Sequence, residues 1–186
     1  MLIRRACAGD ERQIAHVHTE SWKTTYRGIV PDAFLDRLTI ESRLPQWEQA
    51  LCEQGEERIV LVAEQEDGTI VGFASGGKER EGSLPYEGEL YALYILKAMQ
   101  QVGIGRQLAT SMVRELQQLG MGSMVIWALE QNPACRFYEK MGGRPVRKQP
   151  ITIAGRELVE VAFGWNRLEP FGKGMKMADD GELRID

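Results

Sequence analysis

A glycine-containing loop from Gln100 to Arg106 is the first segment whose residue types could do chemistry. Its two glycines, Gly103 and Gly105, let consecutive backbone N–H groups turn toward one point, and a helix N-terminus there adds about half a positive charge. Together they predict a binding site for a diphosphate. Two other interpretations stay open: the glycines only shape a tight turn between a strand and a helix, or they belong to a dinucleotide-binding fingerprint.

The dinucleotide fingerprint GxGxxG requires a third glycine, where this sequence has Leu108. A leucine there obstructs the close packing of helix on strand that the fingerprint serves. Glu130, at the end of the next predicted strand, could act as the acid that binds a ribose. However, the segment lies in mid-chain behind a predicted antiparallel hairpin, and no second nucleotide-binding half follows it. The pattern therefore disfavours a nicotinamide dinucleotide.

A second candidate segment runs from Asn132 to Gly143 and follows the loop after one helix and one strand. Its first residue suits a helix N-cap, Pro133 suits the first helical position, and Gly142 suits a helix end. The aromatic pair Phe137-Tyr138 is compatible with ordinary core packing. By itself this segment predicts a short capped helix, and only its place after the loop suggests more.

The composition is that of one globular domain, with 186 residues, 43% of them hydrophobic and 27% charged. The net charge of −4 disfavours nucleic acid as a partner, because phosphate contacts need clustered Lys and Arg, and it weakly suits a cationic substrate. Cys7, Cys52 and Cys135 are widely spaced, which predicts reduced thiols in the cytoplasm and neither a disulfide frame nor a metal site. No apolar run approaches the ~20 residues of a membrane span, and the first five residues lack the apolar stretch of a signal peptide.

The hydrophobic periodicity predicts a mixed α/β domain over residues 1–168 and a tail over 169–186 that adds nothing to the core. The expected order is β-α-α-β-β-β-α-β-α-β-β around one sheet. Pro45 is expected to break the second helical stretch, which starts at Asp32. A Gly-rich connection is expected over 76–88. Strands are expected at 2–5, 59–63, 69–74, 89–96, 124–129, 146–153 and 157–165, and the other helices at 10–21, 104–119 and 133–141.

Taken in register, Gln100-xx-Gly103-x-Gly105 and Asn132-Pro-Ala-xx-Phe137-Tyr138-Glu139-Lys140-xx-Gly143 resemble the two CoA-binding motifs of the GNAT superfamily of N-acetyltransferases. The similarity extends to 90–95 before the loop, to 105–108 after it and to the order of elements, so it covers roughly residues 1–165. The six-residue step from Asn132 to Tyr138 is one shorter than in many members, and Lys97-Ala98 replaces a common Pro-Glu. The resemblance implies the GNAT fold, with a central splayed, mostly antiparallel sheet, and acetyl-CoA as the cofactor.

The resemblance also implies where acetyl-CoA binds. The pantetheine arm would enter between strands 89–96 and 124–129 and pair with backbone groups of Leu93 and Ile95. Asn132 would hydrogen-bond the arm, and Tyr138 would face the sulfur and protonate the leaving thiolate. The residues expected on the diphosphate side are Gln100, Gln101, Val102, Gly103, Ile104, Gly105 and Arg106. The candidates for the 3′-phosphate are Arg106, Arg136 and Lys140.

Transfer to an amine needs a base. A lysine-like amine has a pKa near 10.4, so at pH 7 only about one molecule in 2,500 is neutral, a penalty of roughly 4.6 kcal/mol. Glu89 is the candidate base, since it begins the splayed strand and is expected to share a face with Tyr91 and Leu93; an ordinary edge-strand carboxylate is the alternative. Glu87 is the substitute. Cys135 has no histidine nearby in sequence, so we expect direct attack in a ternary complex and no acyl-enzyme.

The acceptor pocket of the family is built from the first two helices, their connection and the last hairpin. Aromatic faces and carboxylates there suit a cationic amine, although Trp22 and Tyr26 are equally compatible with pinning the helix connection. His16 and His18 are two apart and cannot share a helix face, so neither receives a role. The amine, small molecule or peptide, stays open, as do a sensor that binds acyl-CoA without turnover and a homodimer. The predicted acceptor residues are Glu20, Ser21, Trp22, Tyr26, Tyr86, Glu87 and Tyr91.

Overall fold

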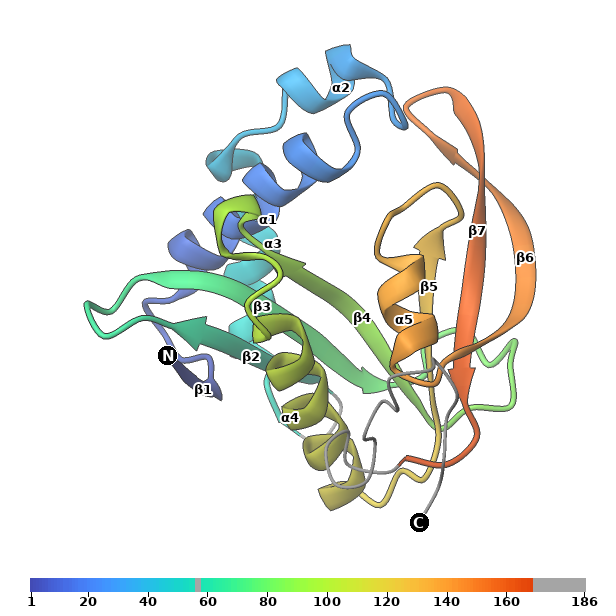
Figure 1. Ribbon diagram of the computed structural model, residues 1–186. Helices are drawn as coiled ribbons and strands as arrows, with labels where there is room; N and C mark the ends of the chain where they lie inside the picture. The colour runs from blue at the N-terminus through green and yellow to red at the C-terminus, as the bar shows by residue number, and fades with distance from the viewer. Residues whose placement is uncertain (56–57, 169–186) are drawn as a thin grey trace, which may run out of the picture.

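The computed structural model describes residues 1–55 and 58–168, so the predicted tail at 169–186 lies outside the described residues. The chain forms one seven-stranded sheet in the order β1-β2-β3-β4-β5-β7-β6, with helices on both faces (Figure 1). The predicted mixed α/β fold is confirmed. The elements are β1 Leu2–Arg5, α1 Glu11–Thr25, α2 Asp32–Asp36, α3 Ile40–Cys52, β2 Arg58–Glu64, β3 Ile70–Lys78, β4 Gly88–Ile95, the 3₁₀ turn η1 Lys97–Met99, α4 Ile104–Gln118, β5 Met124–Leu129, α5 Cys135–Lys140, β6 Arg144–Ile153 and β7 Arg156–Trp165.

The sheet opens between β4 and β5. Every other neighbouring pair is antiparallel, whereas β4 and β5 are parallel and pair only at Gly88 with Met124 and Glu89 with Val125. Beyond Glu89 the two strands diverge toward the end of the sheet where α1 and α2 lie (Figure 1). The predicted splay of a mostly antiparallel sheet is confirmed. We call the opening between the two strands the wedge.

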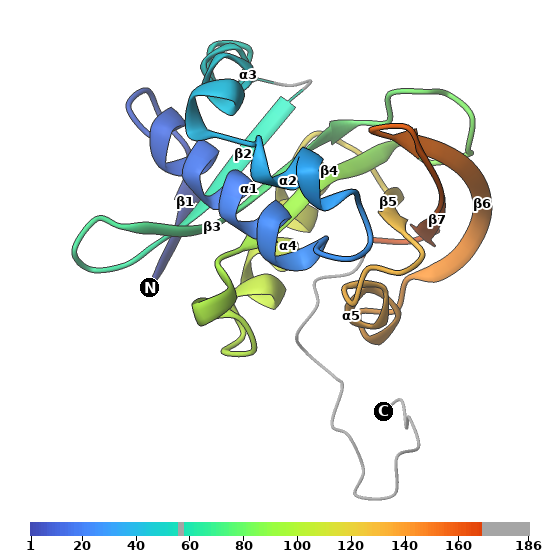
Figure 2. The same cartoon turned by 90° about the horizontal axis from the view of Figure 1, so that it is seen from above.

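Two hydrophobic layers sandwich the sheet. Helices α4 and α5 pack on one face and α1 and α3 on the other, and the sheet runs from β1 at one side to β6 at the other (Figure 2). The apolar run of β2 follows from this arrangement, because Ile59 and Leu61 face α4 while Val60 and Val62 face α1 and α3. The predicted stripe of α4 is confirmed at Leu108, Met112, Val113 and Leu116, all buried.

The expected break at Pro45 is wrong. The second helical stretch instead ends at Asp36, and α3 begins after Thr39, whose hydroxyl accepts the N–H of Ser42 in a capping box. Pro45 lies inside α3, where it removes one intrahelical hydrogen bond. The buried residues Trp47 and Ala50 hold the rest of the helix on the sheet, so tertiary packing overrides the local preference.

The expected Gly-rich connection is shorter than the sequence suggested. β3 continues to Lys78, so Gly76 and Gly77 belong to the strand. A Cβ on Gly76 would lie 2.8 Å from the Met112 sulfur and 2.8 Å from the Glu89 carbonyl oxygen. Glycine there lets α4 and β4 approach β3 closely, which is a packing role and no sign of a loop.

Gly143 fixes the position of α5. A Cβ at this residue would lie 2.6 Å from the Trp165 ring and 3.0 Å from the Tyr138 carbonyl oxygen. The Trp165 indole N–H also donates to the Met141 carbonyl at 2.9 Å. The end of α5 is therefore seated directly on β7, and the absence of a side chain at 143 sets how close it lies.

We expect Gly143→Ala to lower the free energy of unfolding by about 1–3 kcal/mol, since an inserted methyl in a packed contact must displace its neighbours. Urea denaturation would measure the loss. Gly55→Ala is the matched control, because a Cβ at Gly55 meets nothing within 4 Å. An unchanged midpoint for Gly143→Ala would show that Trp165 does not confine this turn.

Candidate active site

Backbone groups of β4 point into the wedge. The N–H of Leu96 donates to the Val71 carbonyl on β3 at 2.9 Å. Because successive residues of a strand direct their backbone groups to opposite sides, Ile95 and Leu93 direct theirs away from β3, toward β5. No β5 residue pairs with them in the described ladder. The wedge thus offers a strand edge without a β5 partner at the two residues named from the sequence.

The loop at residues 100–106 lies against the end of this edge. The Gln100 amide donates to the Ile95 carbonyl at 3.1 Å and so ties the loop to the wedge. Gln101 and Gly103 adopt left-handed conformations with φ of 64° and 90°, and α4 begins at Ile104. The first N–H groups of a helix have no carbonyl within it. These N–H groups, from Gly103 to Arg106, give the donor set that an anionic diphosphate requires.

The two glycines of the loop have different roles. At Gly103 the nearest atom to an added Cβ is 4.0 Å away, so the left-handed φ and not crowding requires glycine. At Gly105 an added Cβ would lie 3.3 Å from Ile95 and 3.5 Å from the Phe137 ring. Gly105 therefore sets how closely α4 approaches β4 and α5, which is a packing role.

Three side chains join across the wedge. The Asn132 amide donates to the Tyr26 hydroxyl at 3.1 Å, and that hydroxyl lies 3.2 Å from the hydroxyl of Tyr94. The Asn132 amide oxygen accepts the N–H of Ala134 at 2.9 Å. The sequence predicted Asn132 on the pantetheine arm and Tyr26 in the acceptor pocket; the structure instead joins them to each other, and both are buried.

Tyr138 is buried beside this network. Its ring contacts Phe137 and Phe163, with centroids 5.5 and 5.8 Å away. Burial raises the pKa of Tyr138, and the nearby hydroxyl of Tyr94 and thiol of Cys135 add to the rise. A phenol with a raised pKa keeps its proton at neutral pH, which is the state of a proton donor.

Glu89 lies where the wedge begins, but the expected alternation with Leu93 is wrong, whereas Tyr91 and Glu89 both contact Arg80. A β-bulge makes Tyr91 an extra residue, since Leu90 pairs with Gly76 and Ala92 pairs with Ser75. Leu93 consequently packs on the α4 side, while Ala92 packs on the α1 and α3 side. The buried Glu89 carboxylate forms an ion pair with Arg80, accepting hydrogen bonds from its side chain and backbone N–H.

The other predicted acceptor residues do not form one group. Tyr91 lies on the acceptor side, where its hydroxyl donates to the Lys78 carbonyl and Arg80 stacks on its ring. Tyr86 lies across Gly164 of β7. Glu87 instead accepts the N–H of Gly122 in the turn before β5, away from the wedge. Glu20 forms an ion pair with Lys23, and Ser21 is buried; Trp22 packs on Tyr26 with centroids 4.8 Å apart.

Sequence reasoning missed three residues beside the wedge. A cavity of about 440 Å³ lies between α3 and the sheet, and Tyr94, His18 and Arg43 are among its lining residues. His18 stacks on Tyr94 at 5.3 Å, and its Nδ1 accepts the indole N–H of Trp47 at 3.2 Å. Burial, with the charge of Arg43 adding, lowers the pKa of His18 to about 3. The 3.6-residue period places His18 on the apolar face of α1 and was the one signal available for it.

Cys135 has the environment of a structural thiol. Its Sγ donates to the Leu129 carbonyl at 3.3 Å. Burial raises its pKa, and the charge of Glu139 adds to that rise. The thiolate is the nucleophilic form of cysteine, so this environment disfavours an acyl-enzyme at Cys135.

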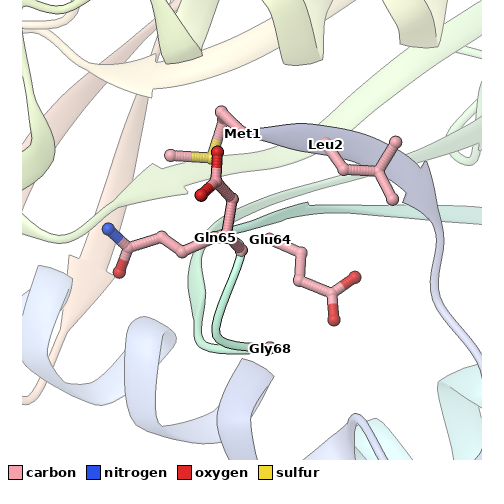
Figure 3. Close-up of a pocket in the computed structure, with 6 residues that line it drawn as sticks. Met1, Leu2, Glu64, Gln65 and Gly68 are labelled. Carbon is pink, nitrogen blue, oxygen red and sulfur yellow. The ribbon is translucent and has the colours of Figure 1, made fainter.

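A second hollow, of about 370 Å³, lies at the opposite edge of the sheet (Figure 3). It is formed by Met1, Leu2 and the β2–β3 turn from Glu64 to Gly68. Glu64 is an ion-pair partner of Arg4. The hollow lies four strands from the wedge and has no part in the site. Within residues 1–55 and 58–168 no group of three or more His, Cys, Asp or Glu could hold a metal ion, and no helix there has the length and apolar character of a membrane span.

A sheet that opens at its single parallel pair, with helix N–H groups without a carbonyl partner at the end of the opening, has the architecture of an acyltransferase that uses coenzyme A. The chain belongs to the GNAT family of acetyltransferases, whose family model, "Acetyltransferase (GNAT) family", matches residues 17–143. Members of this family are enzymes that take the acetyl group from acetyl-CoA. The resemblance inferred from the two motifs is confirmed, and the dinucleotide interpretation of the loop is wrong.

Relatives and solved structures agree with this assignment. The chain is 38% identical over 163 residues, 88% of this chain and 91% of the relative, to YuaI of Bacillus subtilis, named an uncharacterized N-acetyltransferase. It superposes on YncA of Salmonella typhimurium with acetyl-CoA (TM-score 0.66, 24% identity, 91% and 94% of the two chains). It also superposes on the PaiA N-acetyltransferase of Thermoplasma acidophilum in complex with coenzyme A (TM-score 0.64, 22% identity, 86% and 96%). These two structures share the fold.

We expect Gly103→Asp to weaken acetyl-CoA binding at least ~100-fold, because juxtaposed like charges cost several kcal/mol. Gly103→Asn is the matched control, since Asn and Asp tolerate a left-handed φ similarly and differ in charge. Titration calorimetry of both variants would measure the difference. Equal affinity for the two would remove the diphosphate from this loop.

Proposed function

We propose that this enzyme transfers the acetyl group of acetyl-CoA to a primary amine by direct attack in a ternary complex. The observation that carries the proposal is the wedge, where backbone groups of β4 have no β5 partner. One set of side chains lies on the α4 face of the sheet at the wedge, and another set lies on the α1 and α3 face. Two substrates can thus meet from opposite faces of the sheet. The protonated, hydrogen-bonded thiol of Cys135 supports attack without a covalent enzyme intermediate.

The donor side is formed by residues that the chain already positions. Backbone groups of Leu93 and Ile95 would hold the pantetheine arm, and the N–H groups of residues 101–106 would hold the diphosphate. Arg106, Arg136 and Lys140 are exposed and available to the 3′-phosphate. Bound acetyl-CoA supplies an acetyl group activated as a thioester. Asn132 would act by fixing Tyr26 at the wedge, since that is the contact it makes.

On the acceptor side, Glu89 is the residue that would take the proton of the amine. It is buried, and it is the last β4 residue to pair with β5 before the strands separate. Its salt bridge to Arg80 holds the carboxylate in one orientation, and Arg80 itself is half exposed. Deprotonating a lysine-like ammonium group at pH 7 costs roughly 4.6 kcal/mol, so the amine substrate needs a base.

Tyr138 would give its proton to the sulfur of the departing thiolate. Burial keeps the phenol protonated, and the aromatic contacts with Phe137 and Phe163 fix the ring. A thiol pKa near 8.5 makes the thiolate a tolerable leaving group unaided, so this proton should contribute ~10²-fold and not more.

The surroundings of the reaction follow from the same observations. We infer a cytoplasmic enzyme, because all three cysteines are free. The acceptor is a small molecule or a peptide amine. A homodimer stays a prediction, with the last strands or the 170–186 tail as its expected interface, and that tail lies outside the described residues.

A thermal shift with acetyl-CoA, compared with NADH, tests the proposal first. At a hundredfold over Kd, binding adds about 2.7 kcal/mol, which corresponds to roughly 5–10 °C for a domain of this size. Thiol release with an amine panel then separates an enzyme from a sensor. No shift with acetyl-CoA would contradict the proposed function, and a shift without thiol release from any amine would favour the sensor.

Glu89→Gln should lower kcat by about 10²–10⁴-fold with acetyl-CoA affinity retained, as expected when a general base is lost and its shape is kept. Arg80→Gln is the control: it removes the salt bridge and leaves the carboxylate, so the loss should be much smaller. Steady-state kinetics on both variants gives the comparison. Wild-type turnover in Glu89→Gln would leave Glu89 as a partner of Arg80 alone.

Tyr138→Phe should lower kcat by about 10²-fold while acetyl-CoA affinity stays within a few-fold, because the ring is kept and only the proton is removed. Phe163→Leu serves as the control for a loosened ring, which should alter stability more than turnover. If Tyr138→Phe is as fast as the wild type at saturating substrate, another group protonates the thiolate.

A further inference from the structure

Tyr94 is shared by the cavity between α3 and the sheet and by the network across the wedge. Tyr94 lines the cavity, and its hydroxyl lies 3.2 Å from that of Tyr26 in the network across the wedge. The cavity therefore opens on the acceptor side of the sheet, opposite α4. Its lining includes His18, Trp22, Arg43, Arg80, Tyr91 and Tyr94.

Arg43 is the arginine of this cavity whose charge the described chain leaves unpaired. Arg58 is paired with Glu53 at 3.2 Å, and Arg80 is paired with Glu89. Arg43 forms no ion pair with any residue in 1–55 or 58–168, and its Nε is buried without a hydrogen-bond partner. Arg43 is half-buried, and a charge that is partly removed from water without a partner is costly. Its retention at the wall of a cavity points to a ligand group that completes it.

Stacking on Trp22 does not account for Arg43. The guanidinium carbon lies 5.0 Å from the centroid of the Trp22 ring. A cation–π contact engages the face of the guanidinium, whereas its N–H donors lie along its edge. The stacking thus fixes the plane of the guanidinium and leaves the edge for an acceptor. A planar fork held in one orientation is the group that binds a carboxylate through two hydrogen bonds.

The surroundings of Arg43 favour one anionic group close to the reacting amine. Burial raises the pKa of Tyr94, with the hydrogen bond to Tyr26 and the charge of Arg43 acting against the rise. Arg43 is therefore near enough to Tyr94 to act on its charge. Burial, then the charge of Arg43, keeps His18 neutral, so it adds no second positive charge. One free guanidinium matches a carboxylate better than a doubly charged phosphate.

We propose that the acceptor is an amine that carries a carboxylate a few bonds from its nitrogen, as in an amino acid, and that Arg43 binds this carboxylate and sets specificity. The inference rests on the proposed acetyl transfer at the wedge. It differs from the expectation of a purely cationic amine, because the charge without an ion-pair partner among the described residues of this cavity is positive.

Matched acceptors test the inference. Acetyl-CoA-dependent thiol release would be measured with the free amino acids, their α-amides and the corresponding decarboxylated amines, with O-phosphoethanolamine as the phosphate comparison. We expect the preferred acid to exceed its amide at least ~10-fold in kcat/KM. Arg43→Gln should raise KM for that acid about 10–100-fold, with little change in KM for acetyl-CoA or in the amide reaction. Arg43→Lys should recover part of the loss, since it restores charge without the fork.

Arg37→Gln is the matched control, because Arg37 is exposed at the end of α2; it should behave as the wild type. A thermal shift with acetyl-CoA on each protein separates the two proposals. Loss of that shift in the wild type contradicts the proposed function itself. Where the shift with acetyl-CoA is intact, three outcomes would each overturn the carboxylate inference alone. The enzyme uses amides or O-phosphoethanolamine as well as the acids, it uses no acid at all, or Arg43→Gln affects the acid and the amide equally.

Discussion

The structure depends on one parallel strand pair whose hydrogen-bonded ladder ends after two residues. β4 and β5 pair at Gly88 and Glu89 and then separate, which leaves backbone groups of the central strand without a sheet partner. Unpaired backbone groups inside a protein are costly, so the separation persists only because the packing on both faces enforces it. The same groups are the ones that we propose pair with the pantetheine arm, and such pairing would offset the cost of the opening.

What holds the opening is a set of contacts between segments far apart in the chain. Asn132 and Tyr26, 106 residues apart, are hydrogen-bonded across it, and Tyr94 joins them from β4. On the other face Gly105 and Gly143 allow α4 and α5 to approach β4 and β7 without a side chain between them. Asn132 and Gly105, which belong to the two CoA-binding motifs, thus also make packing and hydrogen-bond contacts that keep the wedge open. A change at Asn132 or Gly105 should therefore be interpreted through these contacts as well as through the cofactor.

The charge of the acceptor side shows why bulk charge says little about a site. The chain carries a net charge of −4, yet the residue left uncompensated beside Tyr94 is an arginine. Carboxylates that the sequence suggested for an amine pocket are already committed: Glu87 to a backbone N–H, Glu20 to Lys23 and Glu89 to Arg80. Local ion pairing decides the electrostatic potential that a substrate meets, and ion pairing depends on which side chains the fold brings together.

The sequence by itself determined the order of the strands, the stripe of α4, the two motifs and through them the family and its cofactor, because periodicity, turns and caps act over a few residues. It did not determine that Thr39 rather than Pro45 separates two helices, or that a bulge at Tyr91 puts Glu89 and Leu93 on opposite faces. Nor did it show His18, Tyr94 and Arg43 around one cavity. Those features depend on strand register and on contacts between distant segments, which only the packing of the whole sheet decides.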